Sequence, residues 1–173
     1  ERSGEGQFID IAMLDSIMPL MGWVAANLLI AGKQPVPMGN DNFTAAPSGV
    51  FRTGDGFINI AANKQEQWEA VCDVLGLPEL KTDPRFEKRD VRKQNRKLLT
   101  PLLEVRLAER TTDEWVELLN ASDVPSGAIL SLADALKQPQ VKHRQTLKDV
   151  PVEGIGSIPL FTLTAKFEKT PGD

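Results

Sequence analysis

The sequence predicts an α/β protein. Within this chain itself, the helices and antiparallel strands are expected in an α+β arrangement. Three observations support this prediction. Two alternating segments flank a turn within residues 50–61, apolar residues recur at helical spacing in several other segments, and glycine and proline separate these segments. With 173 residues and 41% hydrophobic content, the chain is long enough to bury a core, and one or two compact domains are expected.

The amino-terminal segment is expected to form a short strand and then a helix. Residues 7–11 offer one face for burial, and Met13 begins a run of apolar residues at three- and four-residue spacing. We expect Pro19 to kink this helix and Gly32 to end it. The run Ile11–Ile30 approaches the length of a membrane span, but polar residues and proline interrupt it, so we interpret it as a buried helix.

Residues 33–48 are expected to form a linker or an exposed functional loop, and they mark the best domain boundary. The segment is rich in proline, glycine, asparagine and aspartate and has few apolar residues. Between Gly39 and Gly49, small and amide side chains gather. The residues alone leave open whether this part is an active-site flap or an inert linker.

A β-hairpin and a capped helix are expected next. Residues 50–52 and 57–61 flank Thr53–Gly56, where the Asp-Gly pair favours the positive φ angles of a tight turn. Asn63 is expected to cap the following helix, with Glu66 completing a capping box. The buried face of this helix is predicted to consist of Trp68, Val71, Cys72 and Leu75.

Further helices fill most of the remaining chain. Residues 87–97 are expected to form a solvated, charged helix face, and the apolar side continues in the leucines of residues 98–107, with Pro101 tolerated. Thr111 and Glu114 form a second expected capping box. The last segments are predicted as a loop at 124–127, a helix at 131–137, a turn at 138–141 and an extended piece at 160–164.

Composition excludes several classes of function. The net charge of -4, with both signs interspersed, is unlike a nucleic-acid or anionic-membrane surface. Cys72 is the only cysteine and His143 the only histidine, so the chain has no internal disulfide and no Cys/His metal site, and a reducing, cytoplasmic setting is expected. No P-loop, G-x-G-x-x-G, G-x-S-x-G or H-E-x-x-H motif is present.

The reactive side chains receive structural interpretations. We expect His143 at the surface and Cys72 as a packing thiol. Asp10 and Asp15 are assigned capping or surface roles in preference to paired acid-base catalysis. The methionines are expected in the core in preference to a soft-metal site, and they are Met13, Met18, Met21 and Met38.

A series of short motifs runs along the chain: Gly4–Asp15, Pro37–Asn40, Gly49–Gly56, Asp83–Phe86, Val124–Gly127 and Pro139–Val141. In this order and spacing they resemble the class III CoA-transferases of the CaiB/BaiF type. The family includes formyl-CoA transferase, carnitine CoA-transferase (L-carnitine dehydratase-like proteins) and, as an isomerase branch, alpha-methylacyl-CoA racemase. Because the chain begins without methionine, we expect it to be a carboxyl-terminal fragment of such a protein.

The resemblance implies a fold and a domain organisation. Family members combine a Rossmann-like large domain with a small domain, and two subunits thread through each other as an interlocked homodimer. By this resemblance, residues 1–32 end the large domain and residues 33–47 are a linker and active-site loop. Residues 48–149 form the small domain, and residues 150–173 return to the large domain.

The resemblance also implies a mechanism. A family aspartate attacks an acyl-CoA, forms a mixed anhydride and then an aspartyl-CoA thioester, and passes CoA to a second carboxylate. That aspartate is expected upstream of Glu1, so no catalytic residue is assigned here and the isolated fragment is expected to be inactive. Acyl-CoA and a carboxylic acid are the implied substrates, with no permanently bound cofactor and no metal.

Substrate-contacting positions are carried over by the same resemblance. In formyl-CoA transferase a run of glycines closes over the intermediates where this chain has residues 42–47. Because Phe43 and Thr44 are bulkier and stiffer than glycine, formyl and oxalyl substrates are disfavoured. The implied substrate- or CoA-binding residues are Met13, Asn42, Phe43, Thr44, Ala45, Ala46, Ala61, Ala62 and Asn63.

Two alternatives stay open. The racemase branch has a glutamate base where Lys64 stands, and a protonated lysine cannot remove an alpha proton, although a shifted alignment would put Glu66 there. A noncatalytic dimerisation or binding domain is the other alternative, because no complete catalytic set lies within the chain.

Overall fold

A computed structural model describes residues 4, 6, 8–162 and 166 of the chain. The chain divides into two compact units, residues 1–40 and residues 41–173, each of which is described by itself. The predicted mixture of helices and antiparallel strands is confirmed. The division between the units lies within the predicted linker, residues 33–47.

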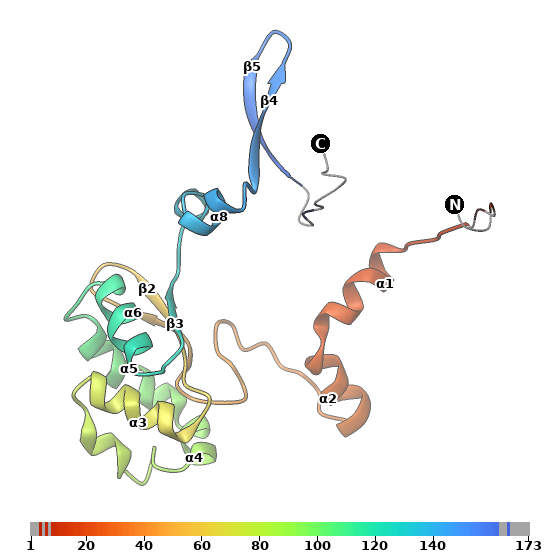
Figure 1. The fold of residues 1–173 in the computed structure, drawn as a ribbon. Coiled ribbons are helices and arrows are strands. Elements are labelled where there is room, and N and C mark those ends of the chain that lie inside the picture. Colours follow the sequence, from red (N-terminus) through yellow and green to blue (C-terminus); the bar gives the residue numbers. More distant parts are fainter. Residues whose placement is uncertain (1–3, 5, 7, 163–165, 167–173) are drawn as a thin grey trace. The chain divides into compact units, whose positions relative to one another are not determined.

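The first unit consists of short helices: α1 (Met13–Ile17), the 3-10 helix η1 (Met18–Met21) and α2 (Trp23–Ala31) (Figure 1). The predicted start at Met13 and the end at Gly32 are confirmed, because Gly32 adopts φ 63° and donates its N–H to Leu28 O at 3.0 Å. The expected kink is a complete break with an 80° bend. Pro19 lies in η1, and Gly22, at φ 52°, separates the helices. The strand expected at residues 7–11 is wrong for residues 8–11, which are irregular, while Gln7 lies outside the described residues.

The expected burial of Ile11–Ile30 is also wrong. None of the residues of α1, η1 or α2 is buried, and Met13 is 89% exposed. The reason is that the first unit contains no other helix or strand among its described residues against which these helices could pack. Among the described residues no single helix is long and apolar enough to cross a membrane. The bent pair Met13–Met21 and Trp23–Ala31 meets the length and composition criterion only when its helices are joined.

The second unit is built on a three-stranded antiparallel sheet in the order β1-β2-β3. The predicted hairpin is confirmed as β1 (Ser48–Arg52) and β2 (Phe57–Ala61), with Phe51 opposite Ile58. The third strand, β3 (Ser126–Ala128), pairs with β2 where a loop was expected. Its three residues are too few to show an alternating pattern, so only the pairing with β2 reveals it.

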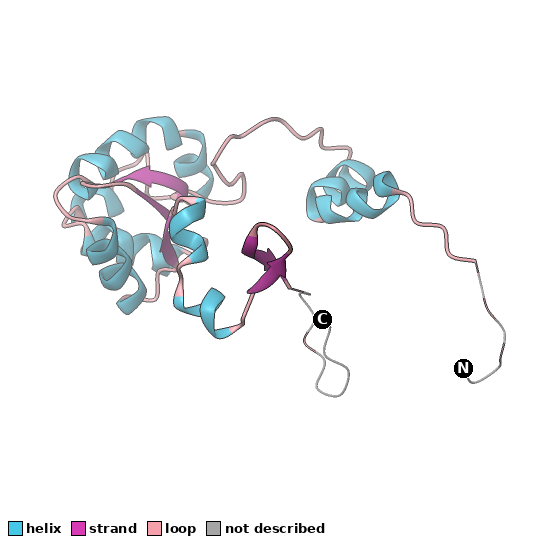
Figure 2. Ribbon diagram, turned by 90° about the horizontal axis from the view of Figure 1, so that it is seen from above, coloured by secondary structure: helices cyan, strands magenta, loops and turns pink. Residues whose placement is uncertain are grey.

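Five helices of the second unit pack against this sheet or against one another: α3 (Gln65–Val74), η2 (Pro78–Lys81), α4 (Arg89–Gln94), α5 (Arg96–Leu107) and α6 (Thr112–Ala121). They lie around the short strands in Figure 2. Ile58 and Ile60 of β2 are fully buried, whereas Phe57 and Asn59 are exposed, so one face of the sheet carries the core. The core side chains include Phe51, Trp68, Val71, Cys72, Leu75, Phe86, Leu99, Leu103, Leu107, Trp115, Leu119 and Val124.

The hairpin turn has a different cause from the one expected. Neither Asp55 nor Gly56 adopts a positive φ. Instead, the Asp55 carboxylate accepts hydrogen bonds from the Thr112 N–H and hydroxyl, both at 2.8 Å. Gly54 donates its N–H to Arg110 O at 2.9 Å, and a Cβ at Gly54 would lie 2.8 Å from that oxygen. The turn is therefore fixed by its contact with the start of α6.

The two capping predictions have different outcomes. At α6 the Glu114 carboxylate accepts from the Thr111 N–H at 2.9 Å and the Thr111 hydroxyl accepts from the Glu114 N–H, which confirms the capping box. At α3 the prediction is wrong by one residue. The N-cap is Lys64, and the amide oxygen of Gln67 accepts its N–H at 3.0 Å, so Asn63 and Glu66 do not form the box.

The remaining elements are α7 (Leu132–Leu136), α8 (Pro139–His143), β4 (Leu147–Val152) and β5 (Gly156–Phe161). The helix expected at 131–137 is confirmed. The turn expected at 138–141 is wrong, because Pro139 occupies the first position of a helix, where its missing N–H costs nothing. β4 and β5 form an antiparallel hairpin, and the extended piece expected at 160–164 is confirmed for Leu160 and Phe161, while residues 163 and 164 lie outside the described residues.

The contact between the hairpin turn and α6 gives a pH-dependent prediction. Hydrogen bonds from the Thr112 N–H and then from its hydroxyl lower the pKa of Asp55 below its ordinary 3.8. A lowered carboxylate pKa stabilises the fold above the unfolded-state pKa, and this stability is lost as pH falls through the folded-state pKa. We therefore expect Asp55→Ala to lower the urea midpoint at pH 7, with the deficit shrinking below pH 3.8. Tryptophan fluorescence measures both midpoints. Glu117→Ala, at an exposed position of α6, is the control. If Asp55→Ala lowered the urea midpoint equally at all pH values, the stabilising role of the Asp55 carboxylate would be contradicted.

Candidate functional site

The predicted active-site loop forms a tight turn at the start of the second unit. Thr44 donates its N–H and its hydroxyl to Asn42 Oδ1, at 2.8 and 2.7 Å. Asn42 in turn donates its N–H to Ser48 O, the first residue of β1, at 2.9 Å. Ala45 and Ala46 are buried, whereas Phe43 at the tip is 39% exposed. The segment therefore presents its tip outward on a buried base.

Three arginines from α4 and α5 donate to the carbonyl oxygens of this loop. Arg89 Nη2 donates to Thr44 O at 3.0 Å, and Arg92 Nε donates to Ala46 O at 2.6 Å. Arg96 Nη2 donates to Asn42 O at 2.7 Å and to Ala45 O at 3.1 Å. These carbonyls lie outside the sheet ladder, so the guanidinium groups supply the partners that a β-strand would otherwise supply. We call residues 41–47 with Arg89, Arg92 and Arg96 the arginine-anchored loop.

Arg92 is the most deeply buried of these cations. It is 1% exposed, and its Nη1 also donates to Phe86 O at 2.6 Å and to Glu87 O at 3.1 Å. Its guanidinium carbon lies 4.7 Å from the ring centroid of Trp68. Burial lowers the pKa of Arg92 from 12.5 to about 10, so the side chain keeps its charge at neutral pH. The prediction of a solvated charged face over residues 87–97 is wrong at this position.

The second predicted contact segment lies directly beside this loop. Ala62, which is buried, donates its N–H to Pro47 O at 3.1 Å. Ala61 donates its N–H to Pro125 O at 2.9 Å, at the approach to β3. Asn63 is exposed and follows in the turn before α3. The fold thus brings residues 42–47 and 61–63 together, although more than a dozen residues separate them in the sequence.

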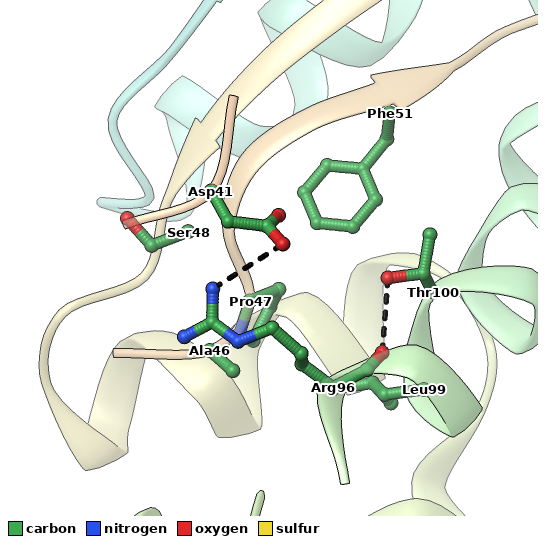
Figure 3. A pocket seen from close by; sticks show the side chains of 8 residues that line it. All are labelled: Asp41, Ala46, Pro47, Ser48, Phe51, Arg96, Leu99 and Thr100. Atoms are coloured by element: carbon green, nitrogen blue, oxygen red, sulfur yellow. Dashed lines mark hydrogen bonds and ion pairs between the residues drawn. The ribbon is translucent and has the colours of Figure 1, made fainter. Parts of the chain in front are cut away.

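A small depression lies at the base of the loop (Figure 3). It has a volume of about 10 Å³, enough for about one water molecule, and Arg96 and Asp41 face each other across it with 3.6 Å between Nη1 and Oδ2. This depression cannot hold an acyl-CoA. Its lining consists of Asp41, Ala46, Pro47, Ser48, Phe51, Arg96, Leu99 and Thr100.

The other candidate residues show no catalytic arrangement in the described part of the chain. Met13 belongs to the first unit, which is described separately. Lys64 and Glu66 are exposed at the start of α3. Asp10, Asp15 and His143 are exposed, and no group of three or more metal-ligating side chains occurs in the described part of the chain. Cys72 is fully buried in the core, as expected.

Sequence reasoning missed the anchoring arginines, although a signal was present. Arg92 and Arg96 precede Leu99, Leu103 and Leu107 at spacings of four, three, four and four residues, so they extend the same apolar stripe toward the amino terminus. Their charge instead favours a solvated face, because arginine is rarely buried. The apolar stripe predicts which face of the helix is buried. Because Arg92 and Arg96 continue that stripe, their positions indicate that both side chains point toward the buried face.

Removing Arg92 should destabilise the second unit. Arg92→Met leaves buried carbonyl oxygens of Ala46 and Phe86 without donors, so we expect a loss of about 3 kcal/mol in the free energy of unfolding. Urea denaturation followed by tryptophan fluorescence measures this loss. Arg106→Met, which removes an arginine bonded to one carbonyl, Leu75 O, is the matched control. Equal losses of stability in both variants would contradict the conclusion that Arg92 stabilises this unit more than Arg106 does.

Cys72 should be chemically inert in the folded chain. Burial raises its thiol pKa from 9.0 to about 12, so almost no thiolate, the reactive form, exists at pH 8. We expect a thiol reagent to modify Cys72 at least about a hundredfold more slowly in buffer than in denaturing urea. The rate of chromogenic disulfide exchange measures this ratio, and comparable rates would indicate an accessible thiol instead of a packed one.

Comparison with known proteins gives a consistent result. The model of CoA-transferase family III matches residues 1–173. Succinyl-CoA:glutarate CoA-transferase of Mus musculus is 34% identical over 168 residues, which cover 97% of this chain and 38% of that protein. Acetyl-CoA:oxalate CoA-transferase of Acetobacter aceti is 33% identical over 147 residues, which cover 85% of this chain and 38% of that protein.

Solved structures agree with the sequence matches. The crystal structure of a CAIB/BAIF family protein from Brucella suis superposes with a TM-score of 0.80 at 32% identity, covering 99% of this chain and 44% of that one. Rv3272 from M. tuberculosis gives a TM-score of 0.77 at 27% identity, with 98% and 44% covered. The chain therefore spans less than half the length of these relatives. Because the family match extends from the first residue to the last, this chain belongs to CoA-transferase family III.

Proposed function

We propose that this chain is part of an enzyme that transfers CoA between an acyl-CoA and a carboxylic acid through an aspartyl-CoA intermediate. The observation that carries the proposal is the family match over residues 1–173. The nucleophilic aspartate is expected before Glu1, so the chain contributes substrate-contacting segments and not the nucleophile. No cofactor is bound permanently in this proposal, and CoA enters and leaves as part of the substrates.

The proposed contacts are Met13, the tip and base of the arginine-anchored loop, and the turn 61–63. The Ala62 N–H to Pro47 O hydrogen bond supports a single surface made by the loop and the turn. Succinyl-CoA and glutarate head the list of substrates to test, because relatives with 34% and 31% identity carry these names. Phe43 at the tip of this loop is bulkier and stiffer than glycine, which argues against formyl and oxalyl groups.

We further propose an interlocked homodimer in a cytoplasmic setting. Support for the dimer comes from the exposed apolar side chains of the first unit, including Met13, Leu20 and Ile30, which are 82 to 89% exposed. The large domain in this proposal includes residues 1–32 and is rejoined by residues 150–173, while residues 48–149 are the small domain.

An alpha-methylacyl-CoA racemase is the second candidate. Lys64 is the N-cap of α3, directly after the turn that contains the proposed contacts, and Glu66 lies in the first turn of that helix. Both side chains are exposed, and a base at this turn would have to reach the alpha proton of the substrate within hydrogen-bond distance. A lysine at the expected base position favours the transferase. A noncatalytic dimerisation or binding domain is the third alternative.

The deciding experiment is mass spectrometry on the full-length protein with a panel of acyl-CoA donors and carboxylate acceptors. We expect transferred CoA and an aspartyl-CoA adduct, with succinyl-CoA and glutarate included in the panel. The chain Glu1–Asp173 alone is the control and should transfer nothing, because it lacks the nucleophile. Loss of an alpha-deuterium label from a branched acyl-CoA, without transfer, would assign a racemase and make Glu66→Gln the next variant. If the protein catalyses neither reaction, the result would support a noncatalytic dimerisation or binding domain.

A further inference from the structure

The arginines of the anchored loop differ in what they contact. Arg92 donates to the base of the loop, at Ala46 O, and to two carbonyls of the segment before α4. Arg96, four residues later at the start of α5, donates to Asn42 O and Ala45 O on either side of the tip and to Lys93 O in α4. The first arginine joins the loop to the core, whereas the second fixes the shape of the tip.

The contacts of Arg96 converge on the outward-facing turn. Its Nη2 bridges Asn42 O and Ala45 O, which are the carbonyls on either side of Phe43 and Thr44. Its Nη1 lies 3.6 Å from the carboxylate of Asp41, the first residue of the second unit. Asn42 Oδ1 closes the same turn by accepting from Thr44. One planar guanidinium therefore holds both ends of the turn at a fixed separation.

Surface turns usually need no such anchor. Arg96 has 14% of its side chain exposed, so its ordering and partial desolvation cost free energy that a solvated loop would not require. A loop that opens and closes as a hinge would gain nothing from a clamp across its two ends. The clamp is consistent with a tip that stays in one geometry before substrate arrives, which lowers the ordering cost of binding.

We propose that Arg96 is a positioning residue, which holds the turn Asn42–Ala45 in the geometry that acyl-CoA requires. The proposal rests on the proposed CoA-transferase function. Arg92 has the complementary role of stabilising the core. The loop is accordingly a preset wall of the acyl site and not a mobile flap.

The variants Arg96→Met and Arg96→Lys of the full-length protein test this role. Methionine removes the hydrogen bonds while keeping an unbranched chain, and lysine keeps the charge but cannot bridge two carbonyls with a planar fork. Arg106→Met is the matched control, because Arg106 Nε also donates to a backbone carbonyl, Leu75 O at 3.0 Å, away from the loop.

The first readout is amide hydrogen exchange. In both Arg96 variants we expect residues 42–45 to exchange at least about tenfold faster, while Ile58 and Ile60 of the central strand keep their protection. The Arg106 control should leave both regions unchanged. Unchanged exchange at residues 42–45 in Arg96→Met would overturn the proposal, because the loop would then keep its shape without the guanidinium.

The second readout is the kinetics of CoA transfer. We expect kcat/KM to fall about tenfold or more in Arg96→Met and in Arg96→Lys, measured at temperatures where both variants remain folded. Methylguanidinium should restore part of the loss in Arg96→Ala, which a general loss of stability would not allow. Equal kinetics in the Arg96 and Arg106 variants would overturn the positioning role. Absence of transfer by the unsubstituted protein would instead reject the proposed function, and hydrogen exchange would still decide the anchoring of the loop.

Discussion

The buried guanidinium of Arg92 is the contact on which the second unit depends most. It joins three segments far apart in the sequence: Ala46 in the loop, Phe86 and Glu87 before α4, and Gln65 at the start of α3. The ring of Trp68 lies against the same cation. A buried cation is unfavourable unless its N–H groups find acceptors, and this fold supplies carbonyls that have no strand partner. The cation and the irregular loop therefore stabilise each other.

A second polar contact, between the β1-β2 turn and α6, also joins segments that are distant in the sequence. The Asp55 carboxylate in the β1-β2 turn accepts from the first N–H of α6, where the partial positive charge of a helix terminus favours an anion. The turn and helix lie 57 residues apart in the sequence. Between these two contacts, Ile58 and Ile60 pack under the helices. Polar contacts thus anchor the loops that precede and follow β1, and the burial of Ile58 and Ile60 determines which face of the sheet packs against the helices.

The sequence predicted those features that neighbouring residues determine. The capping box of Thr111 and Glu114 and the stripe of Leu99, Leu103 and Leu107 follow local rules, and both are observed. Features that depend on distant partners were missed. β3 exists because β2 offers an edge, and Arg92 is buried because Ala46, 46 residues away, needs a donor. Lys64 replaced Asn63 as the cap because Gln67, and not Glu66, reaches the backbone.

The anchoring pattern explains how the predicted contact loop can differ in sequence from the glycine run of formyl-CoA transferase. Arg89, Arg92 and Arg96 bind the loop through its carbonyl oxygens, which every residue type possesses. Burial restricts Ala45, Ala46 and Pro47, and side-chain contacts involve Asp41, Asn42 and Thr44, whereas the arginines contact Phe43 only through neighbouring carbonyls. A substitution at Phe43 or Thr44 changes the surface offered to a substrate while the backbone keeps its donors. The same scaffold can therefore hold tips of different size at little cost to the fold.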